Sequence, residues 1–372
     1  MKKALPLLLL LVAPFAEAQT LLQDTITFER AQVVEVVSER QGNIPGTETP
    51  ATYQTLKLKL LEGPKAGDVI TVDNDYLSLR VGESAYVRHA IDGASGRETY
   101  AVSEPYRIPA LLWLAALFLL CLLVFGGKQG ARGLLALAAS LFFIVYMLLP
   151  GILAGYSPVL VAVGVASLII IAGSYITHGF NRTTSAAVVG MLATILLTGF
   201  IAYVSIHGAR LSGYSTEESV TLNFSTQGGL DFVGLLLGSL LIGLLGVLYD
   251  AAISQAIAIE ELLRAAAHYS RRELFTRGLR IGREHIGALV NTLAIAYAGI
   301  SLPLLLLLST IKTQSIIVTL NQELFATELV RMMVGSIGII LAVPITTVIA
   351  VWMLHGKEKT LRHEDGGHAH HH

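Results

Sequence analysis

The chain has 372 residues, a formal net charge of −1, 53% hydrophobic residues and only 14% charged residues. Soluble domains carry roughly 25% charged residues, so this composition argues against an ordinary soluble protein, and the near-neutral charge argues against a nucleic-acid binder. The single cysteine, Cys121, excludes an intramolecular disulfide and a cysteine-cluster metal site. Because the charges are denser in residues 19–107 than after them, we expect a water-exposed domain there and a membrane domain over residues 108–355.

The first 18 residues have the layout of a secretory signal peptide. Lys2 and Lys3 precede an apolar run from Leu5 to Phe15, and Ala16-Glu17-Ala18 has the small-x-small form of a signal-peptidase site. The alternative is a first transmembrane helix, which needs about 20 apolar residues and therefore more than this run provides. We expect cleavage after residue 18, which places residue 19 onward outside the cytoplasm.

Residues 19–107 are expected to form a small all-β domain of OB-like or sandwich type. Leucine and lysine alternate strictly over residues 56–60, which predicts a strand with one apolar face. Four other β-rich runs cover residues 31–37, 69–72, 85–87 and 99–102, with turn residues between them. Because this segment has no basic stripe with interleaved aromatic residues, we interpret it as a cap or docking module and not as a nucleic-acid binder.

Seven apolar stretches follow, and each is long enough to cross a bilayer. They cover residues 108–126, 134–152, 158–177, 184–206, 231–258, 286–308 and 329–354. An odd number of crossings, starting outside, places the C-terminal segment 356–372 in the cytoplasm of a cell whose plasma (inner) membrane holds the protein.

Basic residues support this orientation. The outer loops between spans carry only Arg210 and Lys312, whereas twelve basic residues lie in the expected inner segments, in agreement with the positive-inside rule. We interpret these twelve residues as topology signals and lipid-headgroup contacts rather than as a binding site. They are Lys128, Arg132, Arg182, Arg264, Arg271, Arg272, Arg277, Arg280, Arg283, Lys357, Lys359 and Arg362.

Asp250 is the most informative residue of the membrane domain, because an ionisable group in an apolar span is costly and usually has a partner or a function. Ser254 follows one turn later on the same face, with Gln255 beside it, and Asn291 and Thr292 lie at a similar depth in the sixth span. If the two spans are neighbours, these side chains converge on a substrate or ion site. The alternative is a polar knot that pins two helices together, for which hydrogen bonds contribute about 0.6–2 kcal/mol in membranes.

Three further residues are secondary polar candidates. Arg283 and Glu284 stand at the start of the sixth span, and Glu284 shares a helix face with Asn291. Arg331 lies just inside the outer end of the seventh span, where we expect it to pair with Glu328 or to extend its charge to the interface.

Small residues and prolines in the spans predict where helices pack closely and where they bend. Gly190, Thr194 and Thr198 recur at i, i+4 and i+8, which predicts a close-packed face and would also permit a homo-oligomer. Pro303 and Pro344 each remove a backbone hydrogen bond and predict a kink. Such interruptions expose carbonyl groups to a cavity in some transporters, and in other proteins they are inert.

Several motifs recur in order along these spans. They are Gly179-Phe180-Asn181-Arg182-Thr183-Thr184, Gly246-Val247-Leu248-Tyr249-Asp250, Ser254-Gln255-Ala256, Gly282-Arg283-Glu284-His285-Ile286-Gly287, Asn291-Thr292-Leu293 and Val343-Pro344-Ile345-Thr346-Thr347. Together they resemble the YibE/F family of membrane proteins over most of residues 55–354. At Glu284 the family pattern more often has aspartate, which keeps the charge. The resemblance implies a polytopic helical fold, and transport is the activity usually suggested for the family.

The C-terminus is rich in histidine. His368, His370, His371 and His372 would lie in the cytoplasm, where such a tract can bind a divalent metal, or they could be the remains of a purification tag. The sequence has no phosphate-binding loop, zinc-protease motif or serine-hydrolase elbow, so we expect neither an enzyme nor another cofactor.

The sequence therefore predicts an integral protein of the lipid bilayer that carries a small solute or ion as a secondary transporter or exporter, with Asp250 in its site. The alternative is a non-transporting scaffold that docks partner proteins through the β domain and the arginine-rich segment 260–283. An intramembrane enzyme is a third interpretation, but no nucleophile and base pair supports it.

Overall fold

The structure is a computed structural model that describes residues 25–75, 78–266, 268–310 and 315–356. The signal peptide expected at residues 1–18 and the histidine-rich tail lie outside the described residues. The chain divides into two compact units, Met1–Leu120 and Cys121–His372.

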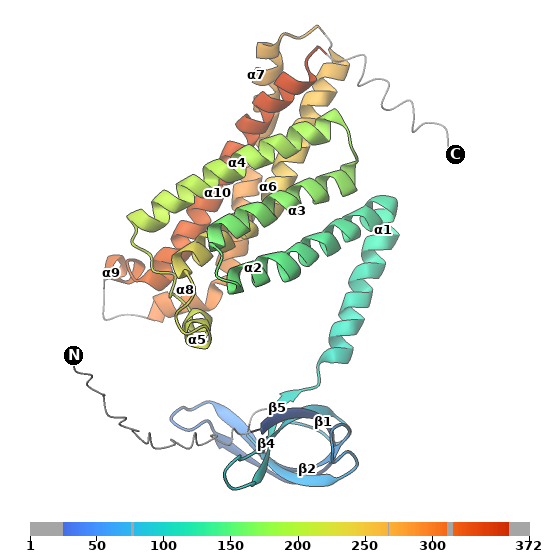
Figure 1. Cartoon of the computed structure of the whole chain (residues 1–372), viewed down its shortest axis with the longest axis vertical. Helices are drawn as coiled ribbons and strands as arrows, with labels where there is room; N and C mark the ends of the chain where they lie inside the picture. Colours follow the sequence, from blue (N-terminus) through green and yellow to red (C-terminus); the bar gives the residue numbers. More distant parts are fainter. Residues whose placement is uncertain (1–24, 76–77, 267, 311–314, 357–372) are drawn as a thin grey trace, which may run out of the picture. The chain divides into compact units, whose positions relative to one another are not determined.

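The first unit contains a five-stranded antiparallel sheet with the strand order β3-β2-β1-β4-β5 (Figure 1). The strands are β1 (Thr25–Asn43), β2 (Pro50–Leu60), β3 (Val69–Asn74), β4 (Ser84–Ile91) and β5 (Glu98–Pro105). Each of the five predicted strands falls within one of these elements. The sheet confirms an antiparallel β domain, whereas the OB-like topology is not confirmed.

Side-chain alternation and bulges shape this sheet. Leu56, Leu58 and Leu60 are fully buried and the lysines between them are not, which confirms the predicted apolar face of β2. The long central strand β1 has register shifts between Val33 and Glu35 and again between Val36 and Ser38. Such irregularities bend a strand, and the bend lets the sheet curl around its leucine core.

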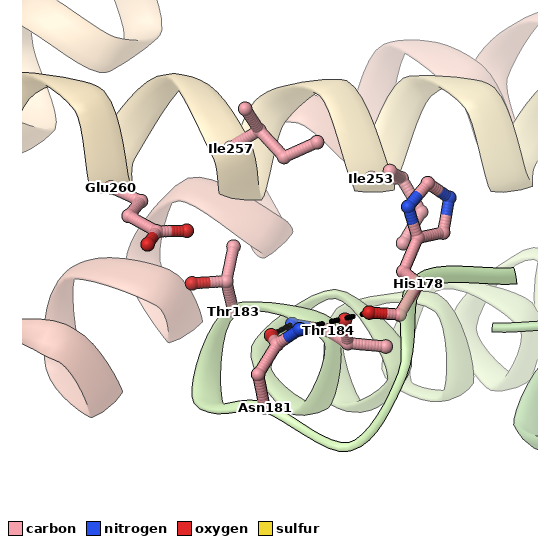
Figure 2. A pocket seen from close by; sticks show the side chains of 7 residues that line it. All are labelled: His178, Asn181, Thr183, Thr184, Ile253, Ile257 and Glu260. Carbon is pink, nitrogen blue, oxygen red and sulfur yellow. Dashed lines mark hydrogen bonds between the residues drawn. The ribbon is translucent and has the colours of Figure 1, made fainter. Parts of the chain in front are cut away.

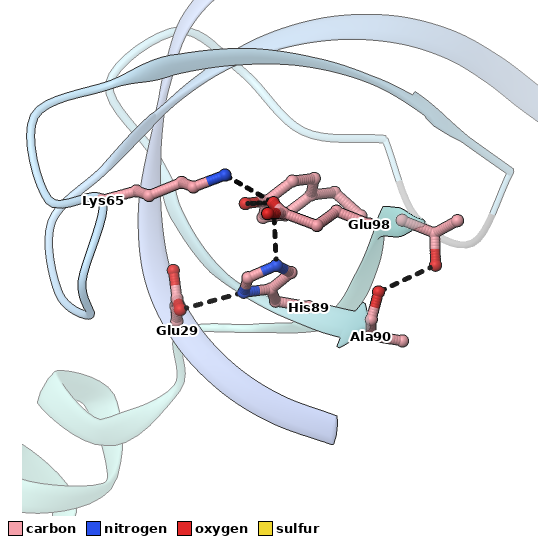
Figure 3. Close-up of polar contacts among 7 residues, drawn as sticks. Glu29, Lys65, His89, Ala90 and Glu98 are labelled. Atoms are coloured by element: carbon pink, nitrogen blue, oxygen red, sulfur yellow. Dashed lines mark hydrogen bonds and ion pairs between the residues drawn. The ribbon is translucent and has the colours of Figure 1, made fainter. Parts of the chain in front are cut away.

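A chain of polar contacts ties the strands together around His89 (Figure 3). The Nδ1 atom of this buried histidine lies 3.3 Å from Glu29 Oε1, and its Nε2 atom lies 3.2 Å from Glu98 Oε2. Lys65, from the turn between β2 and β3, binds the same carboxylate of Glu98 at 2.5 Å. The hydrogen bond from Lys65 is the main cause that lowers the pKa of Glu98 below its ordinary value. The network therefore joins β1, β4, β5 and one turn.

The remaining elements are helical (Figure 1). They are α1 (Ile108–Phe143), the π-helical η1 (Ile144–Leu148), α2 (Leu149–Leu153), α3 (Pro158–His178), α4 (Arg182–Gly208), α5 (Glu217–Ser225), α6 (Phe232–Ala265), α7 (Arg271–Ile300), α8 (Leu302–Thr310), α9 (Ile316–Leu320) and α10 (Glu323–Leu354).

Five of these helical runs are long and apolar enough to cross a membrane, among the described residues. They are the run Ile108–Leu153 and helices α3, α4, α6 and α10. Helices α7 and α8, bent by 68° at Ser301, count as a sixth if the pair forms one span. These helices indicate a membrane protein, but the predicted number of seven crossings is not confirmed.

The difference in number arises at Gly127, within α1. Helix continues on both sides of this residue where a loop was expected, so the run Ile108–Leu153 contains the first two predicted spans and is broken only at Gly127, with φ 53° and ψ −136°. Glycine adopts this left-handed region without the steric cost that a Cβ atom brings. A Cβ on the buried Gly130 would collide with the backbone carbonyl of Leu122, which shows how closely the chain approaches itself beside this break.

The helix boundaries near the arginine-rich segment also differ from the prediction. Helix α6 extends to Ala265 and α7 begins at Arg271, so the inner loop expected around residues 260–283 shrinks to residues 266–270. Ser270 and Glu273 form a reciprocal capping box that starts α7, and arginine and leucine are good helix formers. Most of the basic residues of this segment therefore lie on a helix and not in a loop.

Helices α4, α6 and α10 contact one another in the centre of the second unit (Figure 1). Gly190, Thr194 and Thr198 of α4 are all buried, which confirms the predicted packing face. A Cβ on Gly190 would lie 2.5 Å from Thr346 Oγ1 and 3.1 Å from Thr346 Cα of α10. Only glycine permits this approach of two backbones, and α10 continues through Pro344 beside it.

Candidate functional site

A cavity of about 190 Å³ lies between α6, α7 and α10 and contains part of the predicted site. It includes Asp250, Ser254 and Gln255, so three of the five predicted residues share one cavity, and α7 forms its opposite wall. The lining residues are Asp250, Ala251, Ser254, Gln255 and Ala258 of α6, Ile281, His285 and Leu289 of α7, and Val343 of α10.

Gln255 forms the buried base of this cavity. Its Nε2 atom donates to the backbone carbonyl of Gly278 at 2.9 Å and to Thr347 Oγ1 at 2.7 Å. A Cβ on Gly282 would lie 2.6 Å from Gln255 Oε1, so glycine at this position makes room for the amide oxygen. The amide thus joins three helices, and the polar knot considered for this region lies at Gln255. Its two N–H groups are used, which leaves its oxygen as an acceptor.

Asp250 and Ser254 lie on an exposed line along α6. Ser239, Gly243 and Gly246 precede them on the same face, and all five residues are exposed. Residues spaced three or four apart stack along one side of a helix. No hydrogen bond or ion pair of the Asp250 carboxylate is present among the described residues. A carboxylate in this position needs water, an ion or another chain beside it.

The sequence did not single out His285, which lies across the cavity from α6. The residue belongs to the segment Gly282–Gly287 that carries the family resemblance, and its imidazole comes one turn before Leu289 on the α7 wall. Within the described part of the chain, no lysine or arginine lines this cavity. A carboxylate, a hydroxyl, an amide oxygen and an imidazole can all accept hydrogen bonds or bind a cation.

A dehydrated metal ion is not the natural occupant of these residues. Over the described ranges, no group of three or more histidine, cysteine, aspartate or glutamate side chains could hold one. Asp250 and His285 supply two such ligands, so a metal ion here would keep water molecules in its coordination sphere.

Asn291 and Thr292 are not among the residues that line the cavity. Both are exposed on α7, and the Thr292 hydroxyl donates to the carbonyl of Ala288 in its own helix at 2.9 Å. No hydrogen bond of the Asn291 side chain occurs in the described part of the chain. The structure therefore does not bring these two residues together with Asp250.

The secondary candidates have separate surroundings. Arg283 and Glu284 are exposed, and Arg283 borders a surface hollow of about 410 Å³ that Arg272, Arg277 and Arg280 also line. Arg331 places Nη1 3.0 Å from Glu328 Oε1, which confirms the predicted pair, and Ser301 Oγ donates to the other oxygen of Glu328 at 3.1 Å. This pair ties α10 to the residue at which α7 and α8 bend.

A second cavity, of about 100 Å³, lies where α6 meets the turn between α3 and α4 (Figure 2). Asn181 shapes the turn, since its side chain accepts from the Thr184 backbone N–H at 2.7 Å and donates to the His178 carbonyl at 3.0 Å. The sequence signal for it was an asparagine three residues before a threonine, a common helix N-cap. The residues that line this second cavity are His178, Asn181, Thr183, Thr184, Ile253, Ile257 and Glu260.

The apolar helices, together with the small β domain, define the class: a polytopic helical membrane protein with an appended antiparallel β domain. The chain belongs to the family described as YibE/F-like protein, whose model matches residues 114–356 and confirms the resemblance seen in the motifs. No curated protein and no solved structure matches the chain.

Proposed function

We propose that this protein is a secondary transporter or exporter of a small solute or ion, and that the cavity of Asp250, Ser254 and His285 binds it. The polar groups of this cavity carry the proposal, because acceptor groups outnumber donors there and no lysine or arginine among the described residues lines it. This lining favours a small cation over an anion. Asp250 is the binding carboxylate, and the imidazole of His285 on the opposite wall is the second group that binds the solute.

The exposed line on α6 supplies a route to this cavity. Between Ser239 and Ser254 the helix rises about 22 Å at 1.5 Å per residue, which is most of the thickness of a bilayer core. Gly243 and Gly246 have no side chains to obstruct it, and Gly246 has no neighbouring atom within reach of a Cβ. Small residues along one helix face suit the passage of a solute, so the route supports transport.

The orientation that we propose places the β domain outside the cytoplasm and the C-terminus inside, in the plasma membrane. In this arrangement each arm of α1 crosses once, the pair of α7 and α8 crosses once, and the total is seven. The interruption at Gly127 and the exposed arginines at the start of α7 support it, because basic residues concentrate on the cytoplasmic side.

Flux through purified protein tests the proposal. The protein is reconstituted in liposomes, and proton, sodium, potassium, manganese and zinc movements are followed with entrapped dyes under an imposed gradient. We expect flux of at least one cation, and a loss of tenfold or more in Asp250→Asn. The matched control is Glu261→Gln, which neutralises an exposed carboxylate on the same helix away from the cavity. Equal flux in Asp250→Asn and the unsubstituted protein, with equal elution volumes, would falsify the role of Asp250.

The arginine-lined hollow on α7 favours a second candidate function, a scaffold that docks partner proteins. Arg272, Arg280 and Arg283 have no ion pair among the described residues, and an acidic partner would supply one. In that case a charge-reversed Arg280→Glu variant loses a co-purifying protein, while no cation moves through the liposomes under any gradient.

A further inference from the structure

One face of α7 has no partner among the described residues of the second unit. Of the 30 residues of this helix, four are buried, whereas 17 of the 34 residues of α6 are buried. The bare face carries Glu284, Ala288, Asn291 and Ile295, all of them exposed. On α7 it lies next to the side that carries His285 and Leu289, which borders the same cavity as Asp250 and Ser254 of α6.

This face is unsuited to contact with lipid tails. Asn291 has two amide donors and a carbonyl acceptor, and none of them is hydrogen-bonded in the described part of the chain. Hydrocarbon offers no hydrogen-bonding partner, so a polar side chain at membrane depth is directed towards water or protein. The same argument holds for Asp250, whose carboxylate is exposed on the adjoining surface of α6.

The shape of the face fits another helix. Ala288, Thr292 and Ala296 recur at i, i+4 and i+8 and are exposed, and at Gly287 and Gly299 no atom lies within 4 Å of where a Cβ would stand. Small side chains at this spacing allow two helix backbones to approach closely in a membrane. A packed helix would therefore fit beside this face of α7.

The polar groups of the face indicate which helix this is. An amide is both donor and acceptor, so two copies of Asn291 related by a two-fold axis satisfy each other. The charges are also self-complementary, since exposed Glu284 and the nearby Arg280 and Arg283 have no ion pair among the described residues. A two-fold axis beside α7 brings the glutamate of one copy towards the arginines of the other.

We propose that two copies of this chain pack through this face of α6 and α7, and that the second copy closes the open side of the Asp250 cavity. The single chain then provides one wall of the site, and the dimer provides the enclosure that keeps the carboxylate away from lipid. The inference rests on exposure and polarity of the face and does not require that the protein is a transporter.

Cysteine cross-linking in native membranes tests this dimer. The single cysteine is first removed as Cys121→Ser, and new cysteines are then introduced singly as Ala288→Cys and Ile295→Cys on the proposed interface. Leu196→Cys on α4 is the matched control, because Leu196 is an exposed apolar residue on a different helix. We expect oxidation with copper phenanthroline to yield a covalent dimer at positions 288 and 295, in at least fivefold excess over position 196.

A second measurement separates a dimer from a water-filled surface. Subunit counting by single-molecule photobleaching in nanodiscs should give two copies for the unsubstituted protein and for Asn291→Gln, and mostly one copy for Asn291→Leu. The inference is overturned if one copy is counted for the unsubstituted protein, or if positions 288 and 295 react fully with a water-soluble maleimide and do not cross-link. Both readouts are independent of cation flux, so failure of the dimer and failure of transport are distinguished.

Discussion

The side-chain amide of Gln255 lies 2.7 Å from the hydroxyl of Thr347, and this contact fixes α6 against α10 directly beside the candidate site. The Thr347 hydroxyl in turn donates a hydrogen bond to the backbone carbonyl of Val343 at 2.6 Å, so the two bonds form a continuous chain. Because Gln255 also holds Gly278 of α7, the three helices that line the Asp250 cavity are joined at one point. The hydrogen bonds of Gln255 therefore hold α6, α7 and α10 together at the base of the cavity.

Removing this junction should destabilise the protein. In Gln255→Leu, the carbonyl of Gly278 and the hydroxyl of Thr347 each lose the hydrogen bond that the amide donates. A typical intramolecular hydrogen bond contributes about 0.5–1.5 kcal/mol, so we expect a lower midpoint of thermal unfolding in detergent, followed by circular dichroism at 222 nm. Ser254→Ala is the control, since Ser254 is exposed on the same helix. Equal midpoints for the two variants would show that the junction is not a stabilising contact.

Close packing of α4 against α10 leads to a second prediction. In Gly190→Ala, the new methyl group would meet the Thr346 hydroxyl and backbone, and such overpacking typically costs about 1–3 kcal/mol. Gly164→Ala on α3 is the matched change, because no atom lies within 4 Å of the Cβ added there. We expect the first variant to unfold at lower temperature than the unsubstituted protein, and the second to unfold at the same or a higher temperature, because alanine favours the helix. The opposite order would exclude tight packing at Gly190.

Sequence patterns predicted the strands and the apolar helices because each rests on a local signal. Alternation at Leu56, Leu58 and Leu60 reports one buried face, and long apolar runs report helices that can cross a bilayer. The break at Gly127 agrees with the predicted end of the first span at residue 126. The helix over residues 128–133, where a loop was expected, was not predicted, although Lys128 and Arg132 are good helix formers. The site was predicted in part, because Asp250, Ser254 and Gln255 lie close together on one helix and stay together whatever that helix contacts.

The partner residues on α7 could not be predicted by the same reasoning. In a membrane both the lipid-facing side and the protein-facing side of a helix are apolar, so periodicity does not show which side meets the neighbouring helix. We expected Asn291 and Thr292 opposite Asp250 from their depth alone. In the structure the face turned to α6 carries His285 and Leu289. This rotation about the α7 axis is set by tertiary contacts such as the fit of Gly278 and Gly282 against α6.

Because of the ion pair between Lys65 and Glu98, we expect the stability of the β domain to depend on pH. The hydrogen bond from Lys65 lowers the pKa of Glu98 from 4.5, and the bond to Glu98 raises the pKa of Lys65 from 10.5. A lowered carboxylate pKa adds stability that is complete above 4.5 and is lost as the pH falls through the folded value. A raised amine pKa adds stability that is complete below 10.5 and is lost as the pH rises through the folded value.

Lys65→Gln should therefore differ most from the unsubstituted protein between about pH 5 and pH 10. The observable is the hydrogen-exchange protection of β4 and β5 in the full chain, corrected for the intrinsic pH dependence of exchange. We expect lower protection in the variant at neutral pH and convergence of the two proteins in acid. Lys59→Gln serves as the control, since Lys59 is exposed and has no ion pair among the described residues. A difference that widens as the pH falls would contradict the assigned role of the pair.

The carboxylate of Glu323, at the start of α10, binds the segment that follows α4 and should stabilise it. Its Oε1 atom accepts from the backbone N–H of Ser212 at 2.7 Å and of Gly213 at 2.9 Å, and the Ser212 hydroxyl donates to the same carboxylate at 2.8 Å. Gly213 has φ 81°, and a Cβ there would collide with the carbonyl of Phe232, so the backbone at this point has few alternatives. Hydrogen bonds to a charged group contribute about 1.5–3 kcal/mol, and a glutamine keeps the shape of the side chain while removing the charge.

In Glu323→Gln we expect faster proteolysis and faster hydrogen exchange across residues 209–216, with the exchange of α4 unchanged. Glu217→Gln, a neutralised exposed carboxylate in the first turn of α5, should leave both rates as they are. If residues 209–216 exchange hydrogen at the same rate in the two variants, the carboxylate of Glu323 does not hold this segment.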